Sequence, residues 1–188
     1  MTAIILVGGK SLRMGQNKAF LRCGDKTFIE HQIDKLSKLF DEIILSANDV
    51  NTYSILNIPI VPDITPGKGP LGGICAGLMH AKSFHSFVIA CDMPFINESV
   101  ILYLKELING FDVVVPQTSR GLEPMHAFYS KNCIAPIRRC IEEEKLRIID
   151  FFPSVNVRIV DEKELAELDA PMQSLVNLNT PGEYKKHF

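Results

Sequence analysis

The sequence has no excess of charge of either sign, because 20 basic residues stand against 22 acidic ones in 188 residues. That balance argues against a general attraction to nucleic acid or to an anionic membrane surface. The sequence also lacks an apolar run long enough to cross a bilayer, and no basic region precedes its short N-terminal apolar segment. We therefore expect a cytoplasmic protein that binds neither nucleic acid nor membrane.

The cysteines lack the spacing of a zinc site or a disulfide framework. There are five of them, an odd number, and no two form a C-x-x-C pair. A reducing cytoplasm fits this usage best. Repeats, low-complexity tracts and long runs of like charge are also missing, and the length suits one domain with one core. We therefore predict a single domain over residues 1–188.

Short apolar segments alternate with helix signals through the first 115 residues. Strands are predicted at 3–7, 42–46, 58–61, 86–91 and 111–115. Helices are predicted after the T-x-x-E capping box that begins at Thr27, at 72–82 and at 97–109. A polar connection is expected around 48–52. This alternation predicts a three-layer α/β fold, an open and mostly parallel sheet with helices on both faces.

The rhythm changes after Pro116. A polar turn, a strand, a helix and a further strand are predicted at 117–123, 125–129, 134–144 and 155–160. We expect an antiparallel element in this C-terminal half, which also has room for a second substrate.

The most informative segment spans residues 6–21 and reads LVGGKSLRMGQNKAFL. It follows an apolar run and holds three glycines, which let backbone N–H groups approach an anion, and three cations. These residues are Gly8, Gly9, Gly15, Lys10, Arg13 and Lys18. The segment therefore predicts a phosphate site at the carboxyl end of the first strand.

Two common phosphate motifs do not fit this segment. A P-loop ends in GK[ST], whereas two other residues separate Gly15 from Lys18. The dinucleotide-binding fingerprint fails because the first glycine pair lacks the following glycine at the required distance. A literal G-x-G-x-x-G does occur at 67–72, but Pro70 interrupts it and no opening βαβ unit precedes it.

Polar side chains directly follow several predicted strands, at the edge where an open α/β sheet binds its ligands. Asn48, Asp63 and Asp92 stand at such places. The Asp92 carboxylate, within CDMP (91–94), could hold Mg²⁺ against a phosphate. It could equally cap the following turn, as aspartates often do. Position alone leaves both interpretations open.

Four motifs, in this order and spacing, resemble those of the molybdenum cofactor guanylyltransferases: GGKSLRMG followed by Lys18, GPLGG (69–73), CDMP, and NLNTP (177–181). The resemblance spans nearly the full length. It implies a Rossmann-type fold like that of the nucleotide-diphospho-sugar transferases, with a nucleotide-binding half at about 1–115 and a pterin-binding half at about 116–188. It further implies that GMP is transferred from GTP to the terminal phosphate of molybdopterin, with Mg²⁺ as cofactor and pyrophosphate as the second product.

The resemblance also assigns roles to single residues. Lys18 would contact the phosphates of GTP, and Asp92 would carry Mg²⁺. Lys18 and Arg13 would stabilise the charge that develops at the α-phosphate and on pyrophosphate. The residues expected at the rest of the nucleotide are Leu6, Val7, Gly8, Gly9, Asn48 and Asp63. Asn177 and Asn179 would face the pterin.

Two departures from the family pattern occur. The family most often has aspartate where this chain has Asn17, and glutamate directly after NTP where this chain has Gly182. Cytidylyl-transferring relatives that act on the same pterin usually have alanine-glycine where this chain has Gly8-Gly9, so the glycine pair favours guanine. Transient contacts with cofactor-supplying and molybdoenzyme-maturation proteins are also implied.

Other interpretations stay open at this point. A nucleotidyltransferase that acts on a sugar phosphate would use the same first loop and Asp92. A nucleotide-binding module without transfer activity is the non-enzymatic alternative, although the presence of both Lys18 and Asp92 argues against it. His126, within EPMHAF (123–128), could meet the pterin, but a histidine beside an apolar strand is more often structural.

Overall fold

The computed structural model describes residues 1–7 and 17–178. Six residues with expected roles therefore lie outside the described residues: Gly8, Gly9, Lys10, Arg13, Gly15 and Asn179. The strands of the main sheet are β1 (Thr2–Leu6), β4 (Glu42–Ser46), β5 (Ile60–Val61), β6 (His85–Ala90), β7 (Val113–Thr118), β8 (Gly121–Leu122), β9 (His126–Ser130) and β10 (Val157–Val160). The helices are α1 (Phe28–Leu36), α2 (Val50–Tyr53), α3 (Gly69–His80), α4 (Glu98–Glu106), α5 (Ile134–Glu142) and α6 (Glu162–Leu165).

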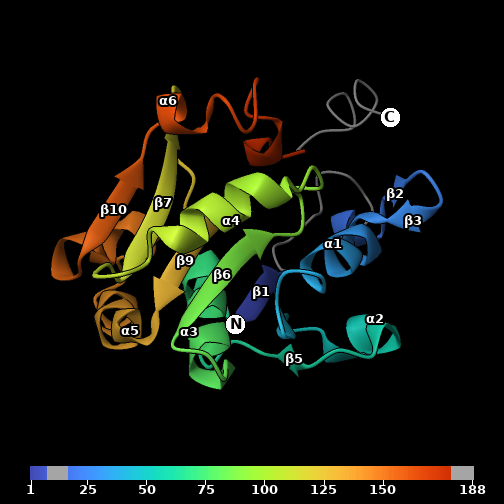
Figure 1. Ribbon diagram of the computed structural model, residues 1–188. Helices are drawn as coiled ribbons and strands as arrows, with labels where there is room; N and C mark the ends of the chain where they lie inside the picture. The colour runs from blue at the N-terminus through green and yellow to red at the C-terminus, as the bar shows by residue number, and fades with distance from the viewer. Residues whose placement is uncertain (8–16, 179–188) are drawn as a thin grey trace.

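The main sheet has the strand order β10-β7-β9-β6-β1-β4-β5, with β8 paired to β7 (Figure 1). The pairs β1–β4, β1–β6, β4–β5 and β7–β10 are parallel. Strand β9 runs antiparallel to both of its neighbours, β6 and β7, and β8 forms a hairpin with β7. The predicted fold class, an open and mostly parallel sheet with an antiparallel element in the C-terminal half, is confirmed.

Helices cover both faces of this sheet, and the side chains of β1 alternate between the two layers. Ala3 and Ile5 pack in a cluster with residues of α1 and α4, whereas Ile4 and Leu6 pack in a second cluster with residues of α3 and α5. A strand that is buried on both faces needs apolar residues at consecutive positions. This explains why the first strand reads as an unbroken apolar run.

Several element boundaries differ from the sequence prediction. The connection expected at 48–52 contains α2, and the strand expected at 58–61 is reduced to Ile60–Val61. Helix α3 begins at Gly69 rather than at residue 72, because Pro70 is accommodated in its first turn. The strand expected at 111–115 is shifted to Val113–Thr118, because β10 pairs with it as far as Pro116 and β8 pairs with its last two residues.

Shorter elements were not predicted at all. A two-stranded hairpin of β2 (Arg22–Cys23) and β3 (Lys26–Thr27) precedes α1. Short 3₁₀ helices are η2 (Lys18–Phe20), η3 (Ser54–Leu56), η4 (Lys131–Cys133), η5 (Ile148–Ser154) and η6 (Gln173–Leu175). Across residues 1–7 and 17–178, no helix is long and apolar enough to cross a membrane.

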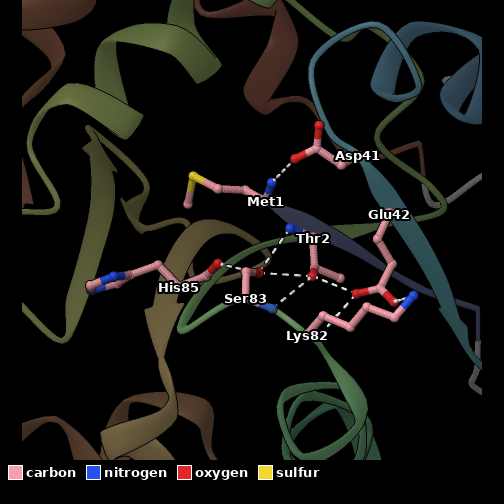
Figure 2. A network of polar contacts seen from close by, with 7 residues as sticks. All are labelled: Met1, Thr2, Asp41, Glu42, Lys82, Ser83 and His85. Atoms are coloured by element: carbon pink, nitrogen blue, oxygen red, sulfur yellow. Dashed lines mark hydrogen bonds and ion pairs between the residues drawn. The ribbon is translucent and has the colours of Figure 1, made fainter.

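The amino ends of β1, β4 and β6 are joined by a polar network (Figure 2). The Thr2 amide donates to Ser83 Oγ at 2.9 Å, and the Thr2 hydroxyl donates to Glu42 Oε2 at 2.7 Å. The N-terminal ammonium pairs with Asp41 beside them. Because parallel strands share one direction, this network fixes the edge of the sheet that lies opposite their carboxyl ends.

Helix α3 packs against β1 so closely that Gly77 has no room for a side chain. A Cβ at Gly77 would lie 2.6 Å from Ile4 Cγ2 and 2.9 Å from Ile4 Cδ1, and Ile4 is fully buried. We expect Gly77→Ala to lower the free energy of unfolding by about 2 kcal/mol, because overpacking outweighs the better helix propensity of alanine.

Gly72→Ala in the same helix is the matched control, since its Cβ would meet its nearest neighbour at an ordinary 3.4 Å. It should leave the stability unchanged or raise it. The two values come from urea unfolding, and equal effects of both substitutions would contradict the close approach of α3 to β1.

Candidate active site

The carboxyl ends of β1, β4 and β6 lie side by side at one edge of the sheet. Leu6, the last residue of β1, pairs with Ser46 of β4 and with Ala90 of β6. The ladder continues beyond these residues, since the Val7 amide donates to the Ser46 carbonyl at 3.0 Å and the Cys91 amide to the Leu6 carbonyl at 3.1 Å. The segments that follow the three strands are therefore brought together at this edge, as the topology predicts.

Lys18 and Asp92 meet at this edge. Lys18 begins the turn η2, and Asp92 follows β6. The Nζ atom of Lys18 lies 3.4 Å from Oδ2 of Asp92, and the side chains are 14% and 18% exposed respectively. The two groups that the sequence assigned to phosphate and metal thus form one partly buried ion pair.

The second carboxylate oxygen of Asp92 is buried. Among the described residues, Oδ1 has no hydrogen-bond partner. A buried carboxylate oxygen without a partner costs free energy, and a bound cation would remove that cost. Within the described part of the chain this oxygen caps no turn, so it gives the capping interpretation no support, and the metal interpretation stays a prediction.

The negative charge of Asp92 also affects its neighbour Cys91. Burial, with the nearby Asp92 carboxylate as the second cause, raises the pKa of the Cys91 thiol to about 12. This thiol is therefore neutral at physiological pH and offers no thiolate nucleophile.

The segment before residue 179 is fixed beside Asp92. The Leu178 amide donates to the Asp92 carbonyl at 2.8 Å. Oδ1 of the preceding residue, Asn177, is buried and unpaired among the described residues. The NLNTP motif therefore begins next to the candidate metal ligand, although its contact with a pterin stays a prediction.

Asn48 and Asp63 form a second polar pair, after β4 and β5. The Asn48 side-chain amide donates to Asp63 Oδ2 at 2.9 Å, and the Asp63 backbone amide donates to Asn48 Oδ1 at 2.9 Å. These reciprocal bonds hold the two loops at one geometry. The sequence placed both residues at the nucleotide, and the structure brings them together.

The GPLGG motif lies against this pair. A Cβ at Gly73 would lie 2.8 Å from Ser46 Oγ and 3.2 Å from Leu6 Cδ2, so a larger residue would push the first turn of α3 away from the sheet. The same Cβ position is 3.6 Å from Asp63 Oδ1. The glycines thus allow the amino end of α3 to approach the carboxyl ends of β1 and β4.

Leu6 and Val7 are 8% and 2% exposed. The Leu6 side chain belongs to the core cluster that packs on α3 and α5, and Val7 belongs to the opposite cluster. Their predicted contact with the nucleotide would therefore involve little side-chain surface, and it stays a prediction.

His126 lies in the core. Its side chain is fully buried and packs edge-to-face on Phe87, with ring centroids 5.0 Å apart. Burial lowers the pKa of His126 to about 4, against the opposing influence of the Asp169 carboxylate. A fully buried ring cannot contact a pterin, so the structural interpretation of this histidine holds.

The low pKa of His126 makes stability depend on pH. The unfolded chain takes up the proton near the ordinary value of 6.5, whereas the folded protein does so only near 4. The contribution of His126 to the free energy of unfolding should therefore be constant well above pH 6.5 and fall by on the order of 3 kcal/mol as the pH drops towards 4. Urea unfolding of the wild type and of His126→Gln at several pH values measures this; identical slopes in both proteins would contradict it.

Besides the Leu178–Asp92 bond, sequence reasoning missed a contact of Asn17 beside Lys18. Asn17 precedes Lys18, and its side-chain amide donates to the Tyr53 hydroxyl at 2.7 Å. Asparagine directly before a short turn is a capping signal that the sequence does contain. Nothing in the sequence points to Tyr53, because the two residues come from segments that only the fold brings together.

Comparison with known proteins agrees with this geometry. Residues 3–152 match the model of the MobA-like NTP transferase domain. A probable molybdenum cofactor guanylyltransferase of Pelotomaculum thermopropionicum is 40% identical over 98% of this chain and 90% of its own length. The molybdenum cofactor guanylyltransferase of Desulfosudis oleivorans is 36% identical over 99% of this chain and 93% of its own.

A solved structure has a similar fold over the whole chain. The crystal structure of molybdopterin-guanine dinucleotide biosynthesis protein A from Archaeoglobus fulgidus superposes with a TM-score of 0.87 at 27% identity, covering 100% of this chain and 96% of the other. The similarity to these relatives spans nearly the whole length of the chain. The chain therefore belongs to the molybdenum cofactor guanylyltransferases and is a nucleotidyltransferase.

Proposed function

We propose that this enzyme transfers GMP from GTP to the terminal phosphate of molybdopterin and releases pyrophosphate. The observation that carries the proposal is the Lys18–Asp92 pair, 3.4 Å apart, at the edge where β1 leads into the glycine-rich loop. A cation that follows the glycine-rich segment, paired with a carboxylate after a neighbouring strand, suits a triphosphate with its metal ion. The names of the relatives supply the identity of the base and of the acceptor.

The proposed reaction needs no nucleophile from the protein. A phosphate oxygen of molybdopterin attacks the α-phosphorus of GTP and forms a new P–O bond, while the bond from the α-phosphorus to the bridging oxygen breaks. Pyrophosphate leaves with that electron pair. The protein has to align the two phosphates and to neutralise the charge that develops on them. Lys18, with Arg13 of the loop, serves this purpose in our proposal.

The Asp92 carboxylate is suited to hold a divalent cation, for which we propose Mg²⁺. Mg²⁺ prefers oxygen ligands and is often held by one or two carboxylates together with substrate phosphates and water. Asp92 offers a buried oxygen that lacks a partner among the described residues. In residues 1–7 and 17–178, at Asp92 as elsewhere, no three His, Cys, Asp or Glu side chains are grouped to hold a metal ion, so the cation would rely on substrate phosphates and water for its other ligands. When bound, the cation would neutralise phosphate charge and bring the triphosphate to Asp92.

The remaining polar groups divide between the two substrates. We place the guanosine near Asn48 and Asp63. The N–H groups of guanine and the hydroxyls of ribose can donate hydrogen bonds, and the Asp63 carboxylate can accept them. We place the pterin near Asn177 and Asn179. The nucleotide then lies mainly against residues 1–115 and the pterin against residues 116–188, and the Leu178–Asp92 hydrogen bond joins the two halves at the reacting phosphates.

A panel of acceptors tests this proposal. GTP and Mg²⁺ are incubated with molybdopterin, with sugar 1-phosphates or without acceptor, and pyrophosphate release is measured. We expect release with molybdopterin and only background release with the others. Turnover of a sugar phosphate in preference to molybdopterin would instead support the sugar-phosphate nucleotidyltransferase interpretation.

A further inference from the structure

Lys18 is carried by a turn that is too short to be stable alone. The turn η2 contains only Lys18, Ala19 and Phe20. Its backbone bonds run from the Phe20 amide to the Asn17 carbonyl at 3.0 Å and from the Leu21 amide to the Lys18 carbonyl at 3.1 Å. Such 3₁₀ turns have poor hydrogen-bond geometry, so their shape depends on outside contacts. The direction in which Lys18 leaves the backbone depends on the same contacts.

Asn17 supplies one of these contacts and is itself held at both ends of its amide. Its Oδ1 accepts from the Ala19 amide at 3.1 Å and so caps the turn. Its Nδ2 donates to the Tyr53 hydroxyl at 2.7 Å. A rotation of the side chain by half a turn would turn the Nδ2 donor towards the Ala19 amide, which is also a donor, and would break the capping bond.

Tyr53 is a rigid partner. Its side chain is 5% exposed, and its ring stacks on Phe20 with centroids 5.5 Å apart and planes 14° from parallel. Tyr53 therefore contacts the turn twice, at the capping residue and at its last residue. Burial, which outweighs the hydrogen bond from Asn17, raises the pKa of the Tyr53 hydroxyl, so that the group stays neutral at physiological pH.

We propose that Tyr53 is a positioning residue for the guanylyl transfer, and that its hydroxyl acts through Asn17 to fix the turn that places Lys18 on the phosphates. The inference rests on the proposed role of Lys18. A lysine side chain has several rotatable bonds, and its ammonium group reaches a defined point only if its backbone is fixed. Misplacement of a charged group by about 1 Å can cost a large factor in rate.

The same contact links the two ends of the nucleotide site. Tyr53 ends α2, the short helix whose N-cap is Asp49, and Asp49 directly follows Asn48. Asn48 is bonded to Asp63 at the proposed guanosine end. One short segment, residues 48–53, thus connects the residues proposed for guanosine with the residue proposed for phosphate.

Tyr53→Phe tests the inference, because it removes only the hydroxyl and keeps the stacked ring. We expect the affinity for Mg²⁺-GTP to fall about fivefold and kcat to fall by a similar factor, as for one lost hydrogen bond. The affinity for guanosine, which has no phosphates, should stay within about twofold. Tyr103→Phe is the matched control. Tyr103 lies on α4, and its hydroxyl donates to Glu164 of α6 at 3.1 Å. We expect this substitution to change neither affinity nor kcat.

The route through Asn17 and Lys18 is tested in variant backgrounds. In Lys18→Ala, Tyr53→Phe should cause no further loss of GTP affinity, because the group that it positions is missing. In Asn17→Asp the carboxylate can accept from both the Ala19 amide and the Tyr53 hydroxyl, so GTP affinity should stay within about threefold of the wild type. Asn17→Ala removes both bonds and should lower the affinity for GTP but not for guanosine.

Two results would overturn the inference. Equal losses for GTP and guanosine would show that Tyr53 acts on the fold alone, and an undiminished loss in the Lys18→Ala background would show that it does not act through Lys18. These binding ratios need no pterin acceptor. A wild-type protein that binds GTP but does not use molybdopterin would therefore contradict the proposed function while leaving the test of Tyr53 intact.

Discussion

Asp92→Asn is expected to lower kcat/KM for GTP by about a thousandfold while leaving the protein folded. Asparagine keeps the size of the side chain but removes the negative charge that the proposed Mg²⁺ site requires. The buried Oδ1 atom has no hydrogen-bond partner among the described residues, and Oδ2 pairs with Lys18, so the substitution removes a partly buried charge together with that ion pair. Pyrophosphate release measured over a range of Mg²⁺ concentrations should show both a lower maximum and a weaker dependence on the metal.

Asp41→Asn is the control for this experiment. Asp41 pairs with the N-terminus at the opposite edge of the sheet, and its side chain is 92% exposed (Figure 2). This variant should turn over GTP like the wild type. If Asp92→Asn also kept wild-type turnover, or lost it only together with its thermal unfolding transition, Asp92 would not be the metal ligand.

Lys18→Gln is the second large effect that we expect, with a loss of about a hundredfold in kcat, equivalent to about 3 kcal/mol of transition-state stabilisation. Glutamine retains most of the length of lysine and removes its charge. The loss should fall on kcat more than on the KM for molybdopterin, because the charge that Lys18 offsets develops on the phosphates of GTP. Initial rates at saturating and limiting molybdopterin separate the two effects.

Lys82→Gln is the matched control for Lys18. Its side chain is 89% exposed and pairs with Glu42 at the other edge of the sheet. Both variants remove one positive charge from the protein, so a general effect of net charge would lower their rates equally. Only a loss confined to Lys18→Gln supports a local role on the phosphates.

Most of the fold could be predicted from the sequence, because its longer strands are buried and apolar. Strands β1 and β4 read as continuous apolar segments, and Thr27 does form the expected capping box at the start of α1. The hairpin of β2 and β3, the helices α2 and α6 and the short 3₁₀ helices were missed. Each of these spans only two to seven residues, so none presents enough of a periodic pattern to be recognised.

The candidate site was accessible where topology alone decides the position of a residue. Asn48, Asp63 and Asp92 follow strands, and parallel strands bring such residues to one edge. The contacts that fix the site were not accessible in this way. The hydrogen bonds of Leu178 to Asp92 and of Asn17 to Tyr53 join segments far apart in the chain, and no local sequence pattern predicts them.

His126 illustrates the same limit. The residue stands at the start of β9 in a motif rich in apolar residues, and the sequence allowed either a core position or a contact with the pterin. Only the packing of Phe87 against its ring decides between them.

The choice of nucleoside triphosphate tests the central claim most directly. The protein is incubated with molybdopterin and Mg²⁺ and with GTP, CTP, ATP or UTP in turn, and the pterin product is identified by its mass. Our account predicts a pterin guanine dinucleotide and pyrophosphate from GTP, with little or no product from the other three. A pterin cytosine dinucleotide formed from CTP in preference to GTP would contradict it.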